Sequence, residues 1–345
     1  MKKCKGCGIE LQYENKDLPG YSPNETFDYC QRCFRLTHYG DTSKVNTKLS
    51  ENKKILNSYK EINDALFVLV IDCFDALIVD QDGFLDSFLD KDVLLVINKI
   101  DLLPKNITED KIYDLYKKQL SKYGHLKNLD CVLTYKNDQS FIEMFFSIMK
   151  EKHYKKAVFI GRVNAGKSSL INKLIENKDL TTSIYPGTTV NLNTIEFNDY
   201  VFVDTPGLLD SESYITYIDK KLVKNILPLK TLKGQNFQSY ENQSYSIEGL
   251  VQITIKTNKN TSILFLVNNN LEVHRTKYDN AENYLNRNVN SFKLKLLPFT
   301  DNVFKVNKYA TFYLKGLGII KVKGNVEVNI RYNDKINVYK NEVNI

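Results

Sequence analysis

The chain has 345 residues and a net charge of +7, and its length is enough for two or three domains with a sizeable buried core. Its apolar, charged and aromatic contents are ordinary for a globular protein, and its longest apolar run, residues 65–71, is far shorter than the roughly 20 residues that cross a bilayer. The N-terminal residues lead into no apolar segment, so we expect no secretory signal, no membrane partner and a cytoplasmic location.

The first segment, residues 1–46, contains paired cysteines and too few apolar residues for a core of its own. Cys4 and Cys7 form one Cys-x-x-Cys pair, and Cys30 and Cys33 form a second pair 22 residues later. Four thiolates in two such pairs suit a closed tetrahedral Zn²⁺ site that is structural, because no ligand position stays open. We therefore predict a zinc-binding module.

The second segment, residues 47–228, alternates short apolar runs with helical patterns. Five runs read as strands: Leu66–Asp72, Val93–Asn98, Asp130–Thr134, Ala157–Ile160 and Val201–Asp204. Continuous Val/Ile/Leu runs between helices are typical of a parallel sheet covered on both faces. The prediction is an α/β fold with a mostly parallel sheet.

A guanine-recognition motif follows the second of these runs. In Asn98-Lys99-Ile-Asp101, the carboxylate of Asp101 can accept hydrogen bonds from both N1–H and the exocyclic amine of guanine. Adenine offers no such pair of donors, so this residue would select the base. After the next run, Thr134 and Tyr135 stand where guanine-nucleotide-binding proteins usually have Ser-Ala, whose backbone contacts the guanine O6. The match to that motif is degenerate.

A phosphate-binding loop lies between the run Ala157–Ile160 and a helical pattern over Ser169–Glu176. The sequence Gly161-Arg-Val-Asn-Ala-Gly166-Lys167-Ser168 has glycines that let backbone N–H groups surround phosphate oxygens. Lys167 would reach the β- and γ-phosphates, and the Ser168 hydroxyl would bind Mg²⁺.

Two further sequence elements predict a Mg²⁺ site and a switch loop that responds to the γ-phosphate. Asp204, in Asp-Thr-Pro-Gly207, ends the run Val201–Val203, so its carboxylate can hold the Mg²⁺ shell and the Gly207 N–H can contact the γ-phosphate. Thr188 and Thr189 suit a loop that offers one hydroxyl to Mg²⁺, and Thr189 is narrowly favoured over Thr188 as that ligand. The expected Mg²⁺ ligands are Ser168, Thr189 and Asp204.

The predicted nucleotide site contains these motif residues and their loop neighbours. The expected GTP- or GDP-binding residues are Asn98, Lys99, Asp101, Thr134, Tyr135, Gly161, Arg162, Val163, Asn164, Ala165, Gly166, Lys167, Ser168, Ser169, Thr188, Thr189, Asp204 and Gly207. Lys167, Asn164, Thr189 and Gly207 are the candidates for catalysis.

The order of the motifs is unusual, because the guanine motif precedes the phosphate loop. A circular permutation preserves a sheet while moving the chain ends to another surface loop. It also sends the chain from the Asp204–Gly207 switch directly into the third segment, so a γ-phosphate that orders the switch could pull on that segment.

The third segment, residues 229–345, changes to short alternating stretches that predict a β-rich or α+β domain. It holds 17 Lys and Arg against 9 Asp and Glu, whereas the rest of the chain is nearly neutral. This excess favours a polyanionic partner such as RNA, although solvated basic faces are common.

The permuted motifs and the N-terminal cysteines resemble the YqeH family of ribosome-assembly GTPases. The likeness extends to Tyr29-Cys30-Gln-Arg32-Cys33, to residues 268–277 and to Gly316-Leu-Gly318. The resemblance implies assembly of the small ribosomal subunit, with the zinc and C-terminal segments contacting rRNA or protein in that subunit or its precursor.

Catalysis should be slow, because Leu208 occupies the position where Ras-like enzymes carry a water-orienting Gln. Similar GTPases use K⁺ beside an Asn of the phosphate loop, and Asn164 matches that position. We hypothesise that K⁺ neutralises charge between the phosphates, the alternative being that Asn164 only supports the loop.

Two other functions are compatible with parts of the sequence. One is a GTP-sensing RNA-binding protein with little or no hydrolysis. The other is a metal-dependent nucleic-acid enzyme, which the four-cysteine zinc site disfavours because it leaves no position for a substrate. The sequence does not determine the oligomeric state.

Overall fold

A computed structural model describes residues 2, 10–15, 21–28, 52, 55–56, 58–59, 62–78, 84–88, 90–121, 130–135, 138–175, 181–184, 193–219 and 221–342. The chain divides into two compact units, Met1–Glu51 and Asn52–Ile345. In the first unit, an isolated β-bridge pairs Gln12 with Tyr21, and the Leu11 side chain is buried. No described helix is both long and apolar enough to cross a membrane.

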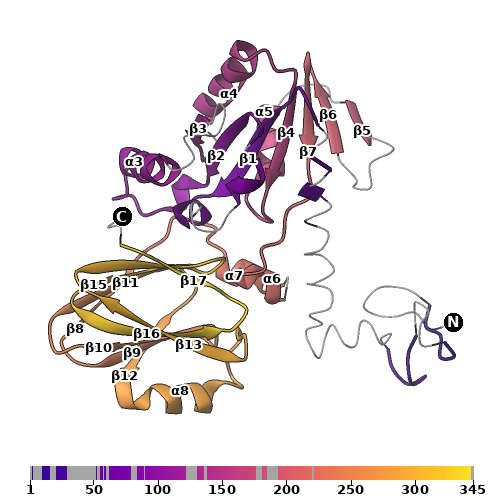
Figure 1. Ribbon diagram of the computed structural model, residues 1–345. Coiled ribbons are helices and arrows are strands. Elements are labelled where there is room, and N and C mark those ends of the chain that lie inside the picture. The colour runs from indigo at the N-terminus through magenta and orange to yellow at the C-terminus, as the bar shows by residue number, and fades with distance from the viewer. Residues whose placement is uncertain are drawn as a thin grey trace. The chain divides into compact units, whose positions relative to one another are not determined.

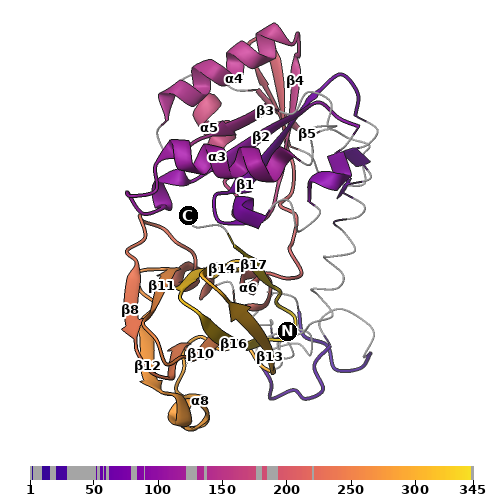
Figure 2. The ribbon, with the colours of Figure 1, turned by 60° about the vertical axis from the view of Figure 1, so that its left-hand side comes forward.

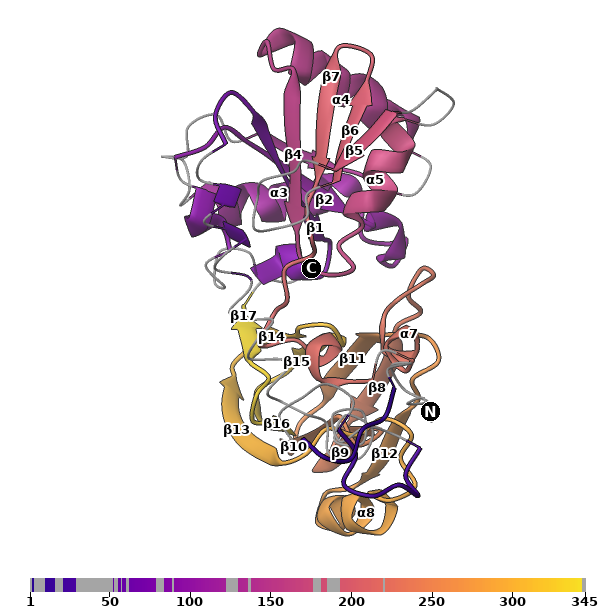
Figure 3. The same cartoon turned by 90° about the vertical axis from the view of Figure 1, so that its right-hand side faces the viewer.

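The first half of the second unit is built on a mixed seven-stranded sheet (Figure 1). In spatial order its strands are β3 (Asp130–Leu133), β2 (Val93–Asn98), β1 (Leu66–Asp72), β4 (Lys156–Gly161), β7 (Tyr200–Asp204), β6 (Asn193–Phe197) and β5 (Thr181–Ile184). The first five run parallel. At one edge, β6 pairs antiparallel with β7, and β5 pairs antiparallel with β6 (Figure 3). The predicted sheet with parallel strands is confirmed.

Helices cover both faces of this sheet because its central strands are apolar on both sides. On one face, β1 side chains such as Phe67 and Leu69 share a core with Ile112 and Tyr116 of α3 (Glu109–Leu120). On the other face, strand residues pack against α4 (Gln139–Glu151) and α5 (Lys167–Leu174). Short helices are η1 (Asp75–Ile78), η2 (Leu85–Phe88), η3 (Ile100–Leu102), α6 (Tyr214–Tyr217) and α7 (Val223–Ile226).

The second half of the unit is a β-sandwich of two antiparallel five-stranded sheets (Figure 2). One sheet is ordered β12 (Val273–Lys277), β9 (Gln243–Ile247), β10 (Val251–Lys256), β16 (Val326–Asn333) and β13 (Phe299–Val306). The other is ordered β17 (Val338–Asn341), β14 (Tyr309–Leu314), β15 (Gly318–Lys323), β11 (Thr261–Val267) and β8 (Gln235–Ser239). The inward-facing side chains, among them Ile253 and Phe265, form one core.

Two short helices complete the sandwich, η5 (Tyr278–Asn280) and α8 (Ala281–Asn288), and α8 lies beside β12 (Figures 1 and 2). The prediction of a β-rich C-terminal region is therefore confirmed.

Candidate functional site

Five parallel strands bring the sequence motifs to one edge of the sheet. In register, Asp72 at the end of β1 pairs with Asn98 at the end of β2. Gly161, which ends β4, pairs with Val70, and Asp204, which ends β7, pairs with Phe159. Because carboxyl ends of parallel strands meet at a single edge, ligands of such sheets bind there.

The guanine motif and the phosphate loop are hydrogen-bonded to each other although they are far apart in the sequence. The buried Asn98 donates from Nδ2 to the carbonyl of Ala165 at 2.9 Å and accepts from the Lys99 backbone N–H at 2.8 Å. Lys99 Nζ donates to Asp72 Oδ2 at 2.7 Å and also to the carbonyl of Asn164. The two stretches therefore converge around the same space.

The phosphate loop has a backbone that suits phosphate binding. Gly166 has φ +100°, and a Cβ added there would lie 2.3 Å from Asn98 Nδ2, so this position requires glycine. Lys167 begins α5, two residues before the predicted start, and its buried Nζ donates to the Gly161 carbonyl at 3.1 Å. Burial lowers the pKa of Lys167, and nearby Asp204 opposes that shift. An ammonium beside free N–H groups at a helix start fits a polyphosphate.

Ser168 and Asp204 provide oxygen ligands suited to Mg²⁺. The Ser168 hydroxyl donates to Asp204 Oδ2 at 2.8 Å. Asp204 Oδ1 is buried and accepts no hydrogen bond from any described residue. A carboxylate oxygen left without a donor beside a hydroxyl fits a hard cation that takes oxygen ligands. The bound ion would neutralise phosphate charge.

The switch after Asp204 lies along the phosphate loop. The Leu208 N–H donates to the Gly161 carbonyl at 3.0 Å, and the Leu208 carbonyl accepts from the Val163 N–H at 2.9 Å. A Cβ on Gly207 would lie 3.0 Å from the Val163 Cα. The Leu208 side chain is buried, so it cannot position a water molecule.

The predicted base-contacting residues surround the ends of β2 and β3. Asp101 lies in η3 with its side chain exposed, after Lys99, whose φ is +67°. Thr134 is buried, with its hydroxyl donating to Asp138 Oδ2 at 3.1 Å, and Asp138 caps α4 by accepting from Phe141 N–H. The backbone carbonyl of the partly exposed Tyr135 accepts from Lys173 Nζ at 3.1 Å.

Several predicted site residues lie outside the described part of the chain. These are Thr188 and Thr189 and the four cysteines, Cys4, Cys7, Cys30 and Cys33. Within the described ranges no three His, Cys, Asp or Glu side chains come close enough together to hold a metal. Ser169 is described, and it is exposed in the first turn of α5.

A buried charge network beside the phosphate loop was not predicted from the sequence. Arg162 Nε lies 3.0 Å from Asp210 Oδ2, and its Nη1 lies 3.7 Å from Asp75 Oδ2. Lys315 of the sandwich, only 2% exposed, lies 3.0 Å from the same Asp210 oxygen and 3.1 Å from Glu212. No local pattern marks Asp210 or Lys315, because their partners are distant in sequence.

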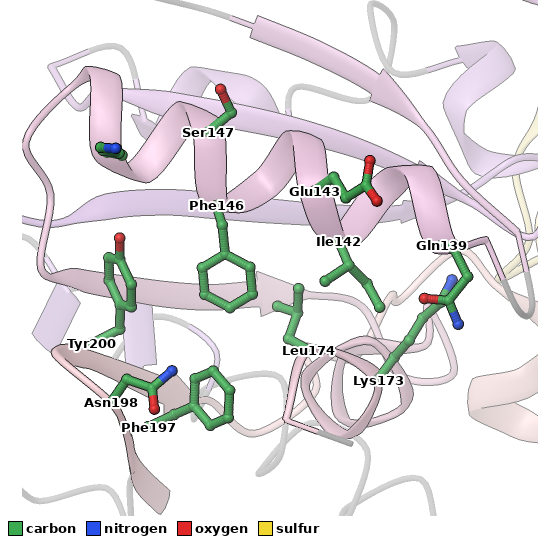
Figure 4. A pocket seen from close by; sticks show the side chains of 11 residues that line it. Gln139, Ile142, Glu143, Phe146, Ser147, Lys173, Leu174, Phe197, Asn198 and Tyr200 are labelled. Atoms are coloured by element: carbon green, nitrogen blue, oxygen red, sulfur yellow. The ribbon is translucent and has the colours of Figure 1, made fainter. Parts of the chain in front are cut away.

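One hollow beside the GTPase sheet lies away from these motifs. Its volume is about 620 Å³, and it is lined by residues of α4, α5 and the β6–β7 turn, among them Phe146, Leu174 and Tyr200 (Figure 4). A smaller pocket of about 40 Å³ adjoins Asn164 and Asp75. The nucleotide site is identified by the geometry of the motif residues and not by the volume of a pocket, since phosphates bind to exposed loops.

A phosphate loop, a strand-ending Asp with a neighbouring Ser, and an Asn-Lys-x-Asp loop along one edge of a parallel sheet define a GTPase of the phosphate-loop class. Such a protein binds GTP or GDP with Mg²⁺. Comparison with known families agrees with this class. The family described as "RsgA GTPase" matches residues 50–213, and the family described as "50S ribosome-binding GTPase" matches residues 156–297.

Individual relatives narrow the assignment. YqeH of Bacillus subtilis (strain 168), described as uncharacterized, is 31% identical over 290 residues, which cover 81% of this chain and 79% of that protein. The chain belongs to the YqeH family of circularly permuted GTPases.

More distant relatives are larger. NO-associated protein 1, chloroplastic/mitochondrial, of Arabidopsis thaliana is 27% identical over 79% of this chain and 58% of that protein. GTPase Der of Buchnera aphidicola subsp. Schizaphis graminum (strain Sg) is 28% identical over 59% of this chain and 50% of that protein. The chain thus spans about half the length of these two relatives.

Proposed function

We propose that this chain is a GTP-hydrolysing switch of ribosome assembly that acts on the small ribosomal subunit or its precursor by binding rRNA. The observation that carries the nucleotide part is the hydrogen bond from Asn98 to the Ala165 carbonyl, which joins the base-reading loop to the phosphate loop. Family membership and the ribosome-binding description of one matching family support the ribosomal part.

Each motif residue has a role in this proposal. Asp101 reads guanine, Lys167 neutralises the β- and γ-phosphates, and the Gly207 N–H contacts the γ-phosphate. Ser168 and Asp204, together with Thr189 in preference to Thr188, hold Mg²⁺. The remaining loop residues from Gly161 to Ser169, with Asn98, Lys99, Thr134 and Tyr135, form the walls of the nucleotide site.

Turnover is slow in this proposal because Leu208 is buried where other GTPases position a water. Asn164, with an exposed side chain and φ +66°, stands where K⁺ would neutralise charge between the phosphates. We expect faster GTP hydrolysis in KCl than in NaCl, and equal rates would contradict a role for K⁺.

The switch is coupled to the sandwich through Asp210 in this proposal. The Asp210 carboxylate is shared by Arg162 of the phosphate loop and Lys315 of the sandwich. Ordering of Gly207 by a γ-phosphate would move this carboxylate and so pull on Lys315. The nucleotide state would thereby change how the sandwich holds its partner.

The proposal has three functional domains: a zinc module at 1–46 with Cys4, Cys7, Cys30 and Cys33 as ligands, the GTPase domain at 47–228, and an RNA-binding domain at 229–345. One end of the sandwich suits RNA. A hollow of about 660 Å³ there is bordered by Lys256 and Lys305, and exposed Lys259 and Lys308 lie in adjoining turns. Tyr240, 69% exposed, offers a ring for base stacking.

Crosslinking in cells followed by sequencing of the attached RNA tests this function. Wild type should recover mainly small-subunit rRNA, and Lys167→Ala should recover less of it, since it binds GTP poorly. The double variant Lys259→Glu, Lys308→Glu should lose crosslinks while retaining GTP binding. Random RNA, or mainly large-subunit rRNA, in the wild-type sample would refute the small-subunit assignment.

The buried Leu208 also favours a second function, a GTP-sensing RNA-binding protein with little or no hydrolysis. Turnover measured with and without small ribosomal subunits separates the two. A basal rate that subunits increase supports the switch, whereas no basal rate and no stimulation supports the sensor.

A further inference from the structure

The segment that leads into the sandwich is attached to the base-reading loop. The Thr231 hydroxyl donates to the backbone carbonyl of Asp101 at 2.9 Å, and the Leu232 N–H donates to the Leu102 carbonyl at 2.9 Å. The Leu232 side chain, 4% exposed, belongs to the same core as Ile97 and other GTPase residues. Three contacts thus fix residues 231–232 against η3.

The other side of this segment is held by one asparagine of the sandwich. Asn269 Nδ2 donates to the Thr231 carbonyl at 3.0 Å, and Asn269 Oδ1 accepts from the Lys233 N–H at 2.8 Å. Its neighbour Asn268, which is buried, donates to the Leu227 carbonyl upstream. A side-chain amide that pairs with a backbone N–H and C=O in this way fixes the direction of the segment.

The Asp101 carboxylate depends on this support. Its side chain is exposed and makes no hydrogen bond or ion pair with a described residue, so only the η3 backbone determines where it points. On the upstream side, Asn98 and Lys99 attach the loop to the phosphate loop. On the downstream side, Thr231 and Leu232 attach the loop by hydrogen bonds, and the buried Leu102 and Leu103 side chains anchor it in the core.

We infer that Asn269 is a positioning residue for guanine recognition, acting through Thr231 on the backbone of Asp101. The inference rests on the proposed function, in which Asp101 accepts from both N1–H and the 2-amino group of guanine. Bidentate acceptance requires the carboxylate to lie in the plane of the base, so small displacements of η3 weaken it. The sandwich therefore contributes to base selection without touching the base.

Comparing inosine diphosphate (IDP) with GDP distinguishes a positioning role of Asn269 from a purely structural one. Hypoxanthine lacks the 2-amino group of guanine but is otherwise the same, so the ratio of the IDP and GDP dissociation constants measures bidentate contact by Asp101. A general loss of stability lowers both affinities and leaves the ratio unchanged. Misplacement of Asp101 lowers the ratio.

The experiment measures both dissociation constants by calorimetry for the full chain and four variants. Wild type should prefer GDP by about tenfold or more, and Asn269→Ala and Thr231→Val should each reduce that preference about fivefold. Asn270→Ala is the matched control, because Asn270 is an exposed neighbour whose side chain makes no hydrogen bond with the described residues, and it should keep the wild-type ratio.

Asp101→Ala separates failure of this inference from failure of the proposed site. If Asp101→Ala removes the preference for GDP but Asn269→Ala keeps the wild-type ratio, the positioning role is wrong. If Asp101→Ala leaves the preference intact, the guanine contact itself is wrong.

Discussion

Arg162 at the start of the phosphate loop lies between two carboxylates with opposite pKa shifts. Burial raises the pKa of Asp75 to about 6, and Arg162 only partly offsets this effect. Burial also acts to raise the pKa of Asp210, but Arg162 and Lys315 together hold it below the usual value. Asp210 is therefore the charged partner of both cations, and Asp75 takes up a proton in mildly acidic solution.

Asp75→Asn should change how stability depends on pH. Because the pKa of Asp75 is higher in the folded chain than in the unfolded chain, the folded state holds an extra proton between about pH 4 and pH 6, and stability falls as pH rises through this window. The shift corresponds to roughly 3 kcal/mol, and water at the 20% exposed side chain reduces this to about 1–2 kcal/mol. An asparagine side chain does not titrate, so Asp75→Asn removes this pH-dependent contribution to the free energy of unfolding.

Urea unfolding at pH 4.5, 5.5 and 7 provides the measurement. The stability of Asp75→Asn relative to wild type should increase by about 1–2 kcal/mol over this range. A difference that does not vary with pH would show that Asp75 stays ionised. Asp210, whose pKa is lowered, loses its stabilising charge only below its unfolded value, so it does not contribute in this window.

At the scale of elements, the β14–β15 hairpin is the part of the sandwich that docks on the switch. Its tip contains Lys315 and Gly316, where φ is +75° and an added Cβ would lie 2.4 Å from Ser213 Oγ. The Lys315 carbonyl accepts from the Tyr214 N–H at 3.0 Å. The tip therefore fits closely against the chain that follows Leu208.

Lys315→Met should destabilise the fold by about 2–4 kcal/mol, because it leaves the carboxylate of Asp210 with less compensation in a buried position. The matched control is Lys256→Met, since Lys256 pairs with Glu327 at 3.4 Å on the surface, with both side chains well exposed. That exposed pair should contribute little to stability, because water and salt screen it. Denaturant unfolding of both variants gives the comparison, and equal losses would contradict a buried network.

Local patterns determine some of these elements and not others. The strands that carry Asp72, Asn98 and Asp204 are predictable because short Val/Ile runs end in polar residues at the sheet edge. Two glycines and a lysine before a helix similarly mark the phosphate loop. The pairing of β10 with β16 and the approach of Lys315 to Asp210 depend on long-range packing, which single-sequence periodicity does not encode.

For the whole molecule, the GTPase sheet and the sandwich are joined by apolar packing as well as charge. Leu266, Tyr313 and Ile319 of the sandwich belong to the same buried cluster as Leu95 and other strand residues of the GTPase sheet. Residues 52–345 form one compact unit, and residues 1–51 form another. We therefore expect the larger unit to unfold cooperatively and the smaller one to depend on its own stabilisation.

Zinc is the proposed source of that stabilisation, because residues 1–46 have few apolar side chains and four closely paired cysteines. Replacing Cys30 and Cys33 by Ser should remove one zinc per chain, make the N-terminal unit sensitive to proteolysis, and leave basal GTP turnover within about twofold. Zinc analysis, limited proteolysis and turnover are measured on the same preparations. The control is Cys131→Ser, which changes a lone cysteine of β3 and should leave the zinc content at one per chain. If the double variant loses GTP turnover as severely as Lys167→Ala does, then the zinc module and the nucleotide site are not independent, and the division into a separately stabilised N-terminal unit is wrong.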